Sequence, residues 1–302
     1  MAIFLPLLYL FAGLPAAAAP EDRAPADLLA GLEVLCLAAP PAASLVQRLT
    51  ELELAVNGRA GHGTIPERIN ALVETVILNS THTISLLFRM NAIEWELYRR
   101  VTNRPIQVRL AELEREVLGQ TGTGAMADRL ETLSAGLWAA GRPLTTPVDL
   151  TPGTLVKVKL LADLSSTANK PGDKFRYEVA ESVIQDGLIV IPKGSTGEGY
   201  ISLIEPPGNM GRDARITMVF GPVSTLDGTS VATTAGEESI AANKTARLTV
   251  RVTAAGMIVL GPAGILSGLF VRGKEVFLAA GTEFYIQTAA VTHCYTLARG
   301  VK

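Results

Sequence analysis

Cysteine, aromatic residues and charge are all scarce in this 302-residue sequence. Two cysteines cannot form a disulfide framework, and a net charge of −2 leaves no basic surplus to neutralise nucleic-acid phosphates. The sequence also lacks zinc-binding Cys/His spacings, a Ser/His/Asp or Cys/His catalytic set, a paired-carboxylate motif and a nucleotide-binding glycine loop. We therefore expect no nucleic-acid partner, no metal, no cofactor and no enzymatic activity.

The two cysteines, Cys36 and Cys294, stand near opposite ends of the chain. An exported protein could join them in a disulfide, but a single pair without a spacing pattern leaves both states open. The three histidines, His62, His82 and His293, are scattered through expected loops and the C-terminal tail. Such a distribution is typical of solvated side chains rather than of metal ligands.

Apolar residues nevertheless make up 48% of the chain, and part of this share stands at the N-terminus. Residues 1–19 carry no charged side chain, run apolar to Leu14 and continue as a tract of small residues, which is the layout of a secretory signal peptide. Cleavage is expected after Ala18, since Ala16 and Ala18 fit the small-residue rule. The alternative is a retained membrane anchor, although the apolar run is shorter than the roughly 20 residues that a span needs. We expect an exported protein of the periplasm or outer membrane.

Lysine is absent from residues 20–142, which hold 12 arginines against 15 acidic residues, whereas residues 143–302 hold 15 basic and 14 acidic residues. The shift coincides with a change from helical to strand periodicity and with a turn-rich stretch. These observations predict a signal peptide at 1–19, a helical domain at 20–142, a linker at 143–150, a β domain at 151–290 and a tail at 291–302.

Arginine recurs in the first domain with a period of about twenty residues, and apolar residues occupy four fixed positions around each arginine. At about 100° per residue, offsets −3, +1, +4 and +8 form one stripe, which predicts five amphipathic helices that must pack on one another. The arginines are Arg48, Arg68, Arg89, Arg109 and Arg129. The apolar residues are Leu45, Ile65, Leu86, Ile106 and Met126 at −3; Leu49, Ile69, Met90, Leu110 and Leu130 at +1; Leu52, Leu72, Ile93, Leu113 and Leu133 at +4; and Val56, Val76, Leu97, Val117 and Leu137 at +8.

The ends of these helices are marked as well. Ser44, Thr64 and Ser85 stand where N-caps are expected, and Pro66 and Pro105 suit first-turn positions. Glycines after the first and fourth units are expected to stop the helix and turn the chain. A preceding segment, 25–39, is expected to form a helix that caps the array.

The five repeated arginines allow two interpretations. In the structural one, each arginine stem covers the edge of the core and its guanidinium pairs with a glutamate or with helix-terminal carbonyls. Glu53, Glu94 and Glu114 share offset +5 and are available as partners. In the functional one, the arginines form a row that binds an anionic envelope polymer such as peptidoglycan or lipopolysaccharide.

Alternating apolar residues indicate strands in the second domain, at 154–161, 174–181 and 246–252, with turn signals between them. About nine short strands are expected, which indicates an all-β barrel or sandwich. The fold class predicted for the whole chain is therefore α+β as two domains: an N-terminal all-α array of five helical repeats of about 20 residues, and a C-terminal all-β barrel or sandwich.

The order of turns and strands in the second domain is similar to a β domain of exported bacterial proteins of undefined role. More distantly, it resembles the β-barrel domain of the core protein of type IV secretion channels and the SAF or β-clip modules of envelope assembly proteins. The resemblance implies a subunit of a secretion or assembly complex. It covers about 140 residues and rests on segments 152–156, 164–166, 172–173, 186–195, 208–211, 227–228, 272–276 and 280–284.

Residues 254–271 form an uncharged stretch of 18 residues with glycines at spacings of three to five. Three interpretations stay open: a buried strand-turn-strand, an apolar loop that contacts a membrane or partner, and a membrane helix, against which Pro262 argues. In the secretion-channel relatives an insert of this domain enters the outer membrane, which the resemblance carries to this segment. The candidate contact residues are Met257, Ile258, Ile265, Leu269 and Phe270.

The function expected from the sequence is that of a non-enzymatic structural or interaction protein of the cell envelope. The helical array would dock a protein partner or a second copy of the chain, and the β domain would assemble or anchor. The alternatives are an envelope-polymer binding module, which would use the arginine row, and a subunit of a secretion or assembly complex.

Overall fold

The structure is a computed structural model that describes residues 24–80, 83–206, 214–245, 257–259, 269–273 and 275–298. The predicted signal peptide and the predicted strand at 246–252 lie outside these residues. The chain divides into two units: Met1–Val148 with Leu226–Thr229 and Tyr295–Lys302, and Asp149–Thr225 with Ser230–Cys294. The first unit is mainly helical and the second mainly β, as the predicted α+β arrangement requires.

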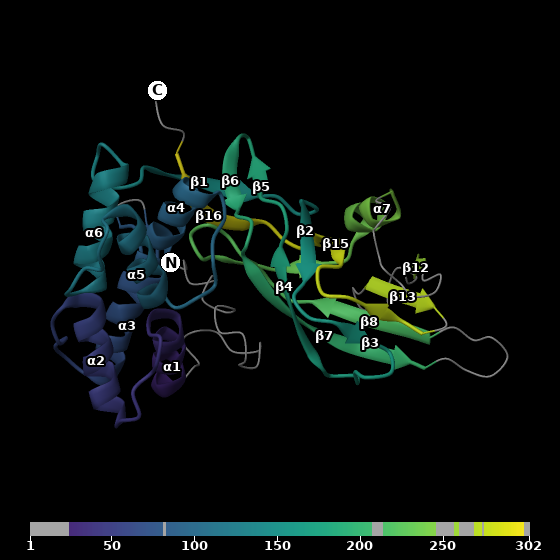
Figure 1. The fold of residues 1–302 in the computed structure, drawn as a ribbon, viewed down its shortest axis with the longest axis horizontal. Coiled ribbons are helices and arrows are strands. Elements are labelled where there is room, and N and C mark those ends of the chain that lie inside the picture. The colour runs from purple at the N-terminus through teal and green to yellow at the C-terminus, as the bar shows by residue number, and fades with distance from the viewer. Residues whose placement is uncertain are drawn as a thin grey trace. The chain divides into compact units, whose positions relative to one another are not determined.

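Six helices follow one another in the helical unit (Figure 1), and five of them begin at the −3 position of a repeat. Ser44, Thr64 and Ser85 are the N-cap residues of the first three repeat helices, as predicted. Pro105 is the N-cap of the fourth rather than a first-turn residue. The helices are α1 (Pro25–Cys36), α2 (Leu45–Asn57), α3 (Ile65–Val76), α4 (Leu86–Tyr98), α5 (Ile106–Val117) and α6 (Met126–Leu137).

A single hydrophobic core joins all six helices. The residues at offsets +1 and +4 are buried in every repeat, because this part of the stripe faces the neighbouring helices. The stripe is wrong in part at offset +8, where Val56 and Val76 are buried but Leu97 and Val117 are exposed. The repeat helices thus begin about every twenty residues, as predicted. In α4 and α5, however, no neighbouring helix among the described residues covers the apolar side chain at offset +8 in the last turn.

The helical unit contains a short segment from far along the chain, Leu226–Thr229. Leu226 is fully buried, and its backbone carbonyl accepts a hydrogen bond from Asn91 Nδ2 at 2.9 Å. The next carbonyl, of Asp227, accepts one from Asn79 Nδ2 at 3.1 Å. Buried backbone carbonyls need partners, and two asparagines of the helical array supply them here.

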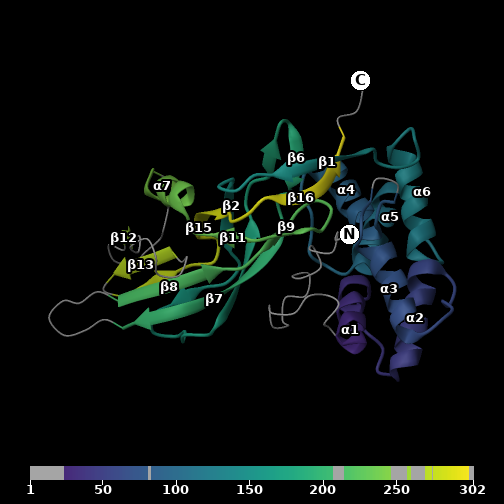
Figure 2. The same ribbon diagram turned by 180° about the vertical axis from the view of Figure 1, so that it is seen from behind.

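The β unit is built on an eight-stranded antiparallel sheet whose order is β11-β15-β2-β4-β7-β8-β13-β12. β11, at one end of the sheet, also lies near β8, the third strand from the other end, so the sheet curls toward a barrel. Figure 2 shows β2, β15 and β11 of this sheet from behind. The strands are β2 (Leu155–Leu160), β4 (Lys174–Val179), β7 (Thr196–Glu205), β8 (Ala214–Phe220), β11 (Thr233–Thr234), β12 (Met257–Val259), β13 (Leu269–Gly273) and β15 (Glu283–Thr288).

Shorter strands pair outside the main sheet, and one helix, α7 (Glu237–Thr245), packs on β15 and β2. The sequence did not predict this helix. The short pairs are β3 (Leu164–Ser165) with β14 (Phe277–Leu278), β5 (Val183–Gln185) with β6 (Leu188–Ile191), β9 (Val223–Ser224) with β10 (Ser230–Val231), and β1 (Thr145–Leu150) with β16 (Thr292–Leu297).

Aromatic rings that lie over glycines form part of the core of the β unit. Phe175 and Tyr177 on β4 are opposite Gly199 and Gly197 on β7. A Cβ atom on either glycine would come within 2.5 Å of the facing ring, so any larger residue at these positions would push the ring out of place. The rings pack on Phe220, at 5.3 Å and 5.1 Å between centroids. These cross-strand contacts fix the register of β4 and β7.

Three segments differ in secondary structure from what the sequence predicts. The expected linker 143–150 contains β1, and the expected tail 291–302 contains β16. The two strands pair with each other, and this pairing satisfies backbone N–H and C=O groups that neither strand could satisfy alone. A membrane helix over 254–271 is also wrong, since β12 and β13 occupy part of this stretch and pair as antiparallel strands. Within the described residues, no helix has the length and apolar character needed to cross a membrane.

Candidate functional site: the arginine–glutamate ladder

Four of the five repeated arginines form ion pairs with a glutamate fifteen residues earlier, on the preceding helix. We call these four pairs the Arg–Glu ladder: Arg48–Glu33, Arg68–Glu53, Arg109–Glu94 and Arg129–Glu114. In each, Nε and Nη2 of the guanidinium donate to the two carboxylate oxygens of the glutamate. This side-on, two-bond geometry is the strongest that the two groups can make. The ladder therefore links α1 to α2, α2 to α3, α4 to α5 and α5 to α6 through charged, directional contacts, but not α3 to α4.

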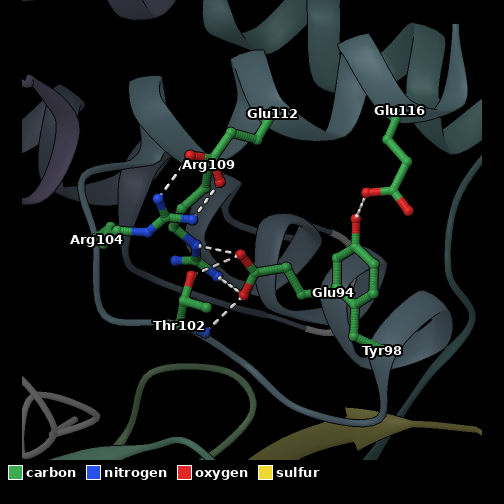
Figure 3. Close-up of polar contacts among 7 residues, drawn as sticks. All are labelled: Glu94, Tyr98, Thr102, Arg104, Arg109, Glu112 and Glu116. Atoms are coloured by element: carbon green, nitrogen blue, oxygen red, sulfur yellow. Dashed lines mark hydrogen bonds and ion pairs between the residues drawn. The ribbon is translucent and has the colours of Figure 1, made fainter.

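The pair between α4 and α5 is the most deeply buried (Figure 3). Arg109 Nε lies 2.9 Å from Glu94 Oε1, and Arg109 Nη2 lies 2.8 Å from Glu94 Oε2. Thr102, in the connection between the helices, donates its backbone N–H and its hydroxyl to the same carboxylate at 2.7 and 2.8 Å. Arg109 Nη2 also donates to Asn91 Oδ1 at 2.7 Å. Both charges are thus surrounded by partners, which a buried ion pair needs.

Glycine replaces threonine at the matching position of two other connections. Gly61 N–H donates to Glu53 at 2.8 Å, and Gly122 N–H donates to Glu114 at 2.9 Å. A Cβ atom on Gly61 would lie 2.4 Å from Glu53 Oε1, and one on Gly122 would lie 2.6 Å from Glu114 Oε1. Only glycine fits at these two positions, because the Glu53 and Glu114 carboxylates come close to the backbone and are each held in place by two hydrogen bonds from an arginine.

The ladder also changes the ionisation of its members. Burial acts to raise the pKa of Glu53, but hydrogen bonds from the Arg68 guanidinium and the Gly61 N–H outweigh it, so this pKa lies below its ordinary value. Arg129 and Gly122 lower the pKa of Glu114 against burial in the same way. Both carboxyl groups are therefore charged at neutral pH, as their arginine partners are.

Arg89 is the exception among the five arginines. Its backbone N–H donates to the Ser85 carbonyl, but its partly buried side chain has no hydrogen bond or ion pair with any described residue. Burial lowers the pKa of Arg89, the charge of Glu131 partly offsets this, and the charge of Arg142 lowers it further. In the preceding helix, the +5 position that holds Glu53, Glu94 and Glu114 in other units holds the buried Val73. This unit is one residue longer than the others, and Glu74, which stands fifteen residues before Arg89, is exposed.

The structure thus places four predicted binding residues, Arg48, Arg68, Arg109 and Arg129, in contacts with glutamate and brings no two of them to one ligand. A guanidinium whose Nε and Nη2 are bound to a glutamate carboxylate of the preceding helix holds helices in position. Binding of an envelope polymer by the arginine row stays a prediction.

The other predicted residues are distributed as follows. Met257 and Ile258 lie on β12, Leu269 and Phe270 lie on the paired strand β13, and Ile265 lies outside the described residues. Contact of this stretch with a membrane stays a prediction. The described part of the chain holds no group of three or more His, Cys, Asp or Glu side chains placed to bind a metal ion.

The structure also settles the state of both cysteines and places two histidines. Cys36 and Cys294 are buried and neither forms a disulfide. Burial raises the pKa of the Cys36 thiol to about 12, so this thiol stays protonated at neutral pH. His62 is exposed in a connection, as expected. His293 lies on β16 rather than in an irregular tail, and His82 lies outside the described residues.

Two features of the ladder escaped the sequence analysis. The carboxylate partner of four of the arginines comes from the preceding helix, and a Glu–Arg separation of fifteen residues was only a partial signal for this, because Glu74 stands fifteen residues before Arg89 and does not pair with it. The contribution of Leu226–Thr229 to the same unit had no signal, because its hydrogen bonds use backbone carbonyls that every sequence offers.

No protein-family model matches the chain, and no curated protein matches it. Among solved structures, the chain is similar to ComB10 of the Com type IV secretion system of Helicobacter pylori. The TM-score is 0.27 and the sequence identity is 16%, over 47% of this chain and 88% of that chain. The likeness is too distant to assign a shared activity.

Proposed function

We propose that this protein is a non-enzymatic structural or interaction protein of the cell envelope. In this proposal the helical unit docks a protein partner and the β unit assembles or anchors. The Arg–Glu ladder is the observation that carries it, because the repeated charges of the helical unit are used to hold helices together.

Rigid helical arrays commonly serve as docking surfaces, since each repeat fixes the position of the next. The ladder supports such a role because its ion pairs, both the buried pair Arg109–Glu94 and the partly buried pairs Arg68–Glu53 and Arg129–Glu114, fix the position of one helix on the next. The connections that the ladder glycines anchor, around Gly61 and Gly122, are exposed and polar. The helical unit can therefore present a defined outer surface without rearranging its core.

A finer form of the proposal makes the protein an exported subunit of a secretion or assembly complex. Its support is the order of strands and turns in the sequence of the β unit, which resembles the barrel domain of secretion core proteins. The uncharged leader at 1–19 supports export, and the apolar stretch 254–271 is the candidate anchor. This form predicts a multimer of the full chain.

A second candidate function, binding of an anionic envelope polymer, is favoured by one observation only. Arg89 is a partly buried cation without a carboxylate partner among the described residues. A single such residue gives a weaker electrostatic site than a row of five would give, and its attraction would be screened by salt.

In-cell crosslinking of the tagged full chain, followed by size-exclusion chromatography, tests the proposal. The expected result is a covalent adduct with an envelope protein or a multimer, together with no sedimentation on purified peptidoglycan. A monomer without adducts that sediments with peptidoglycan in a salt-sensitive way would support the second candidate instead.

A further inference from the structure

We infer that the ends of α4 and α5 form a docking surface for an acidic amphipathic helix of a protein partner, an inference that rests on the interaction role proposed above. The surface, which we call the α4–α5 end patch, consists of Leu97, Tyr98, Val117 and Leu118. All four are exposed apolar side chains in the last turn or C-cap of their helices.

The repeat itself shows that these positions are built to be covered. At offset +8, Val56 and Val76 are fully buried, whereas Leu97 and Val117 are 38% and 39% exposed. At offset +9, Ile77 is buried, whereas Tyr98 and Leu118 are exposed. The same apolar positions are thus closed by neighbouring helices in α3 and left open in α4 and α5. Clustered exposed apolar side chains are typical of interaction sites.

The two halves of the patch are held together as one surface. The Tyr98 hydroxyl at the end of α4 donates to the Glu116 carboxylate at the end of α5 (Figure 3). The Arg99 guanidinium lies over the Trp95 ring, 5.8 Å from its centroid, directly beside the patch. Tyrosine, tryptophan and arginine are the side chains that contribute most to binding energy at protein interfaces.

The charges around the patch favour an acidic partner. The nearby acids already have partners: Glu96 pairs with Arg99, Glu112 with Arg104, and Glu116 with Tyr98. By contrast, Arg100 and Arg115 are exposed and form no ion pair with a described residue. Because the Tyr98 hydroxyl is neutral, Glu116 keeps its negative charge and offsets one of these two arginines, so the net charge beside the patch is positive. Since repeated helices cover the equivalent positions elsewhere, a helix with an apolar stripe and flanking carboxylates fits both features.

Two synthetic peptides test this inference directly on the full chain. Both carry leucine at i, i+4 and i+7 of a helix, and one has glutamate and the other lysine at the flanking positions. Fluorescence anisotropy should show that the glutamate peptide binds at least about tenfold more tightly than the lysine peptide, with a Kd that rises with salt. Equal binding of the two peptides, or no binding of either, would overturn the inference.

Matched variants locate the binding. Leu97→Ser/Leu118→Ser should raise the Kd of the glutamate peptide by about tenfold or more. Val34→Ser/Leu54→Ser, at exposed apolar positions on α1 and α2, should change this Kd by less than about twofold. Arg100→Glu/Arg115→Glu should reverse the preference between the peptides. An equal loss of peptide affinity in the Leu97→Ser/Leu118→Ser and Val34→Ser/Leu54→Ser variants would overturn the inference in favour of nonspecific binding. A dimer of the chain that depends on Leu97 and Leu118 would overturn it in favour of self-association.

The crosslinking experiment above separates this inference from the proposed function. If the full chain forms adducts that persist in the Leu97→Ser/Leu118→Ser variant, the α4–α5 end patch is not the docking surface and the interaction role stands. If the unaltered chain forms neither adducts nor multimers, the interaction role itself fails.

Discussion

The junction between α4 and α5 and the junction between α3 and α4 use different means to join helices of the same repeat. At the first, Glu94 accepts two bonds from Arg109 and two from Thr102. At the second, the matching position holds Val73, and Arg89 has no carboxylate partner among the described residues.

Polar contacts of another kind lie at the second junction. Asn79, after α3, donates to the Asp227 carbonyl and accepts from the Ser85 N–H at the start of α4, 2.9 Å away. Asn91 of α4 donates to the Leu226 carbonyl and accepts from Arg109. The apolar period is thus kept in every unit, whereas the polar link varies with the residue at offset +5.

The largest expected effect comes from breaking the intact junction. Arg109→Met leaves the Glu94 carboxylate buried without its cation, which should lower the free energy of unfolding by about 3–5 kcal/mol. Urea unfolding followed by tryptophan fluorescence measures this, because the only two tryptophans, Trp95 and Trp138, lie in the helical unit. A loss below about 1 kcal/mol would show that the ladder contributes little to stability.

The ladder glycines should give the next largest effect. Gly61→Ala and Gly122→Ala each place a Cβ atom against a carboxylate oxygen held by arginine, which should cost about 1–3 kcal/mol of unfolding free energy. Gly136→Ala is the matched control, since a Cβ atom there meets nothing within 4 Å and lies on α6. It should be neutral or stabilise by up to about 1 kcal/mol. The same cost at all three glycines would contradict the steric argument.

Acid should weaken the ladder in a graded way. The pKa values of Glu53 and Glu114 are lower in the folded chain than the ordinary value of 4.5. The stabilisation is therefore fully present above that value and is lost as the pH falls through the lowered folded pKa. Unfolding free energy measured across pH should stay level near neutrality and fall below about pH 4.5, and Glu53→Gln should flatten this fall. A decline centred between pH 6 and 7 would point to another group.

The smallest effect is expected at the exceptional junction. Arg89→Met removes a partly buried cation without breaking a described ion pair, so the unfolding free energy should change by less than about 0.5 kcal/mol in either direction. The comparison with Arg109→Met, under identical urea unfolding, is the decisive one. A loss at Arg89 as large as at Arg109 would mean that the two junctions are not held differently.

Much of the helical unit could be predicted because its core repeats a period. Offsets +1 and +4 set the helix faces, and three N-caps set the starts: the Ser44 and Ser85 hydroxyls accept from the first turn, and the Thr64 N–H and hydroxyl donate to Glu67. Whether the residue at offset +8 is buried could not be predicted in the same way, because its burial depends on whether another helix covers that end of its own helix. That is a property of the whole array and not of one repeat.

The β unit was predictable in its strands but less so in its boundaries. Alternation identified β2 and β4, whose buried residues occupy every second position. β1 and β16 were taken for a linker and a tail, because each carries prolines, threonines or mixed polar residues, and only their mutual pairing makes them strands. Pairing between residues almost 150 positions apart leaves no local signal.

The presence of Leu226–Thr229 in the helical unit has a consequence for the order in which the protein matures. Synthesis proceeds from the N-terminus, so α1 to α6 emerge from the ribosome well before residue 226 does. Until then the side-chain amides of Asn79 and Asn91 lack the carbonyl acceptors that they have in the finished protein. The helical unit therefore reaches its final state late, after β2, β4, β7 and β8 have also been made, and a chain cut short before residue 226 would leave it incomplete.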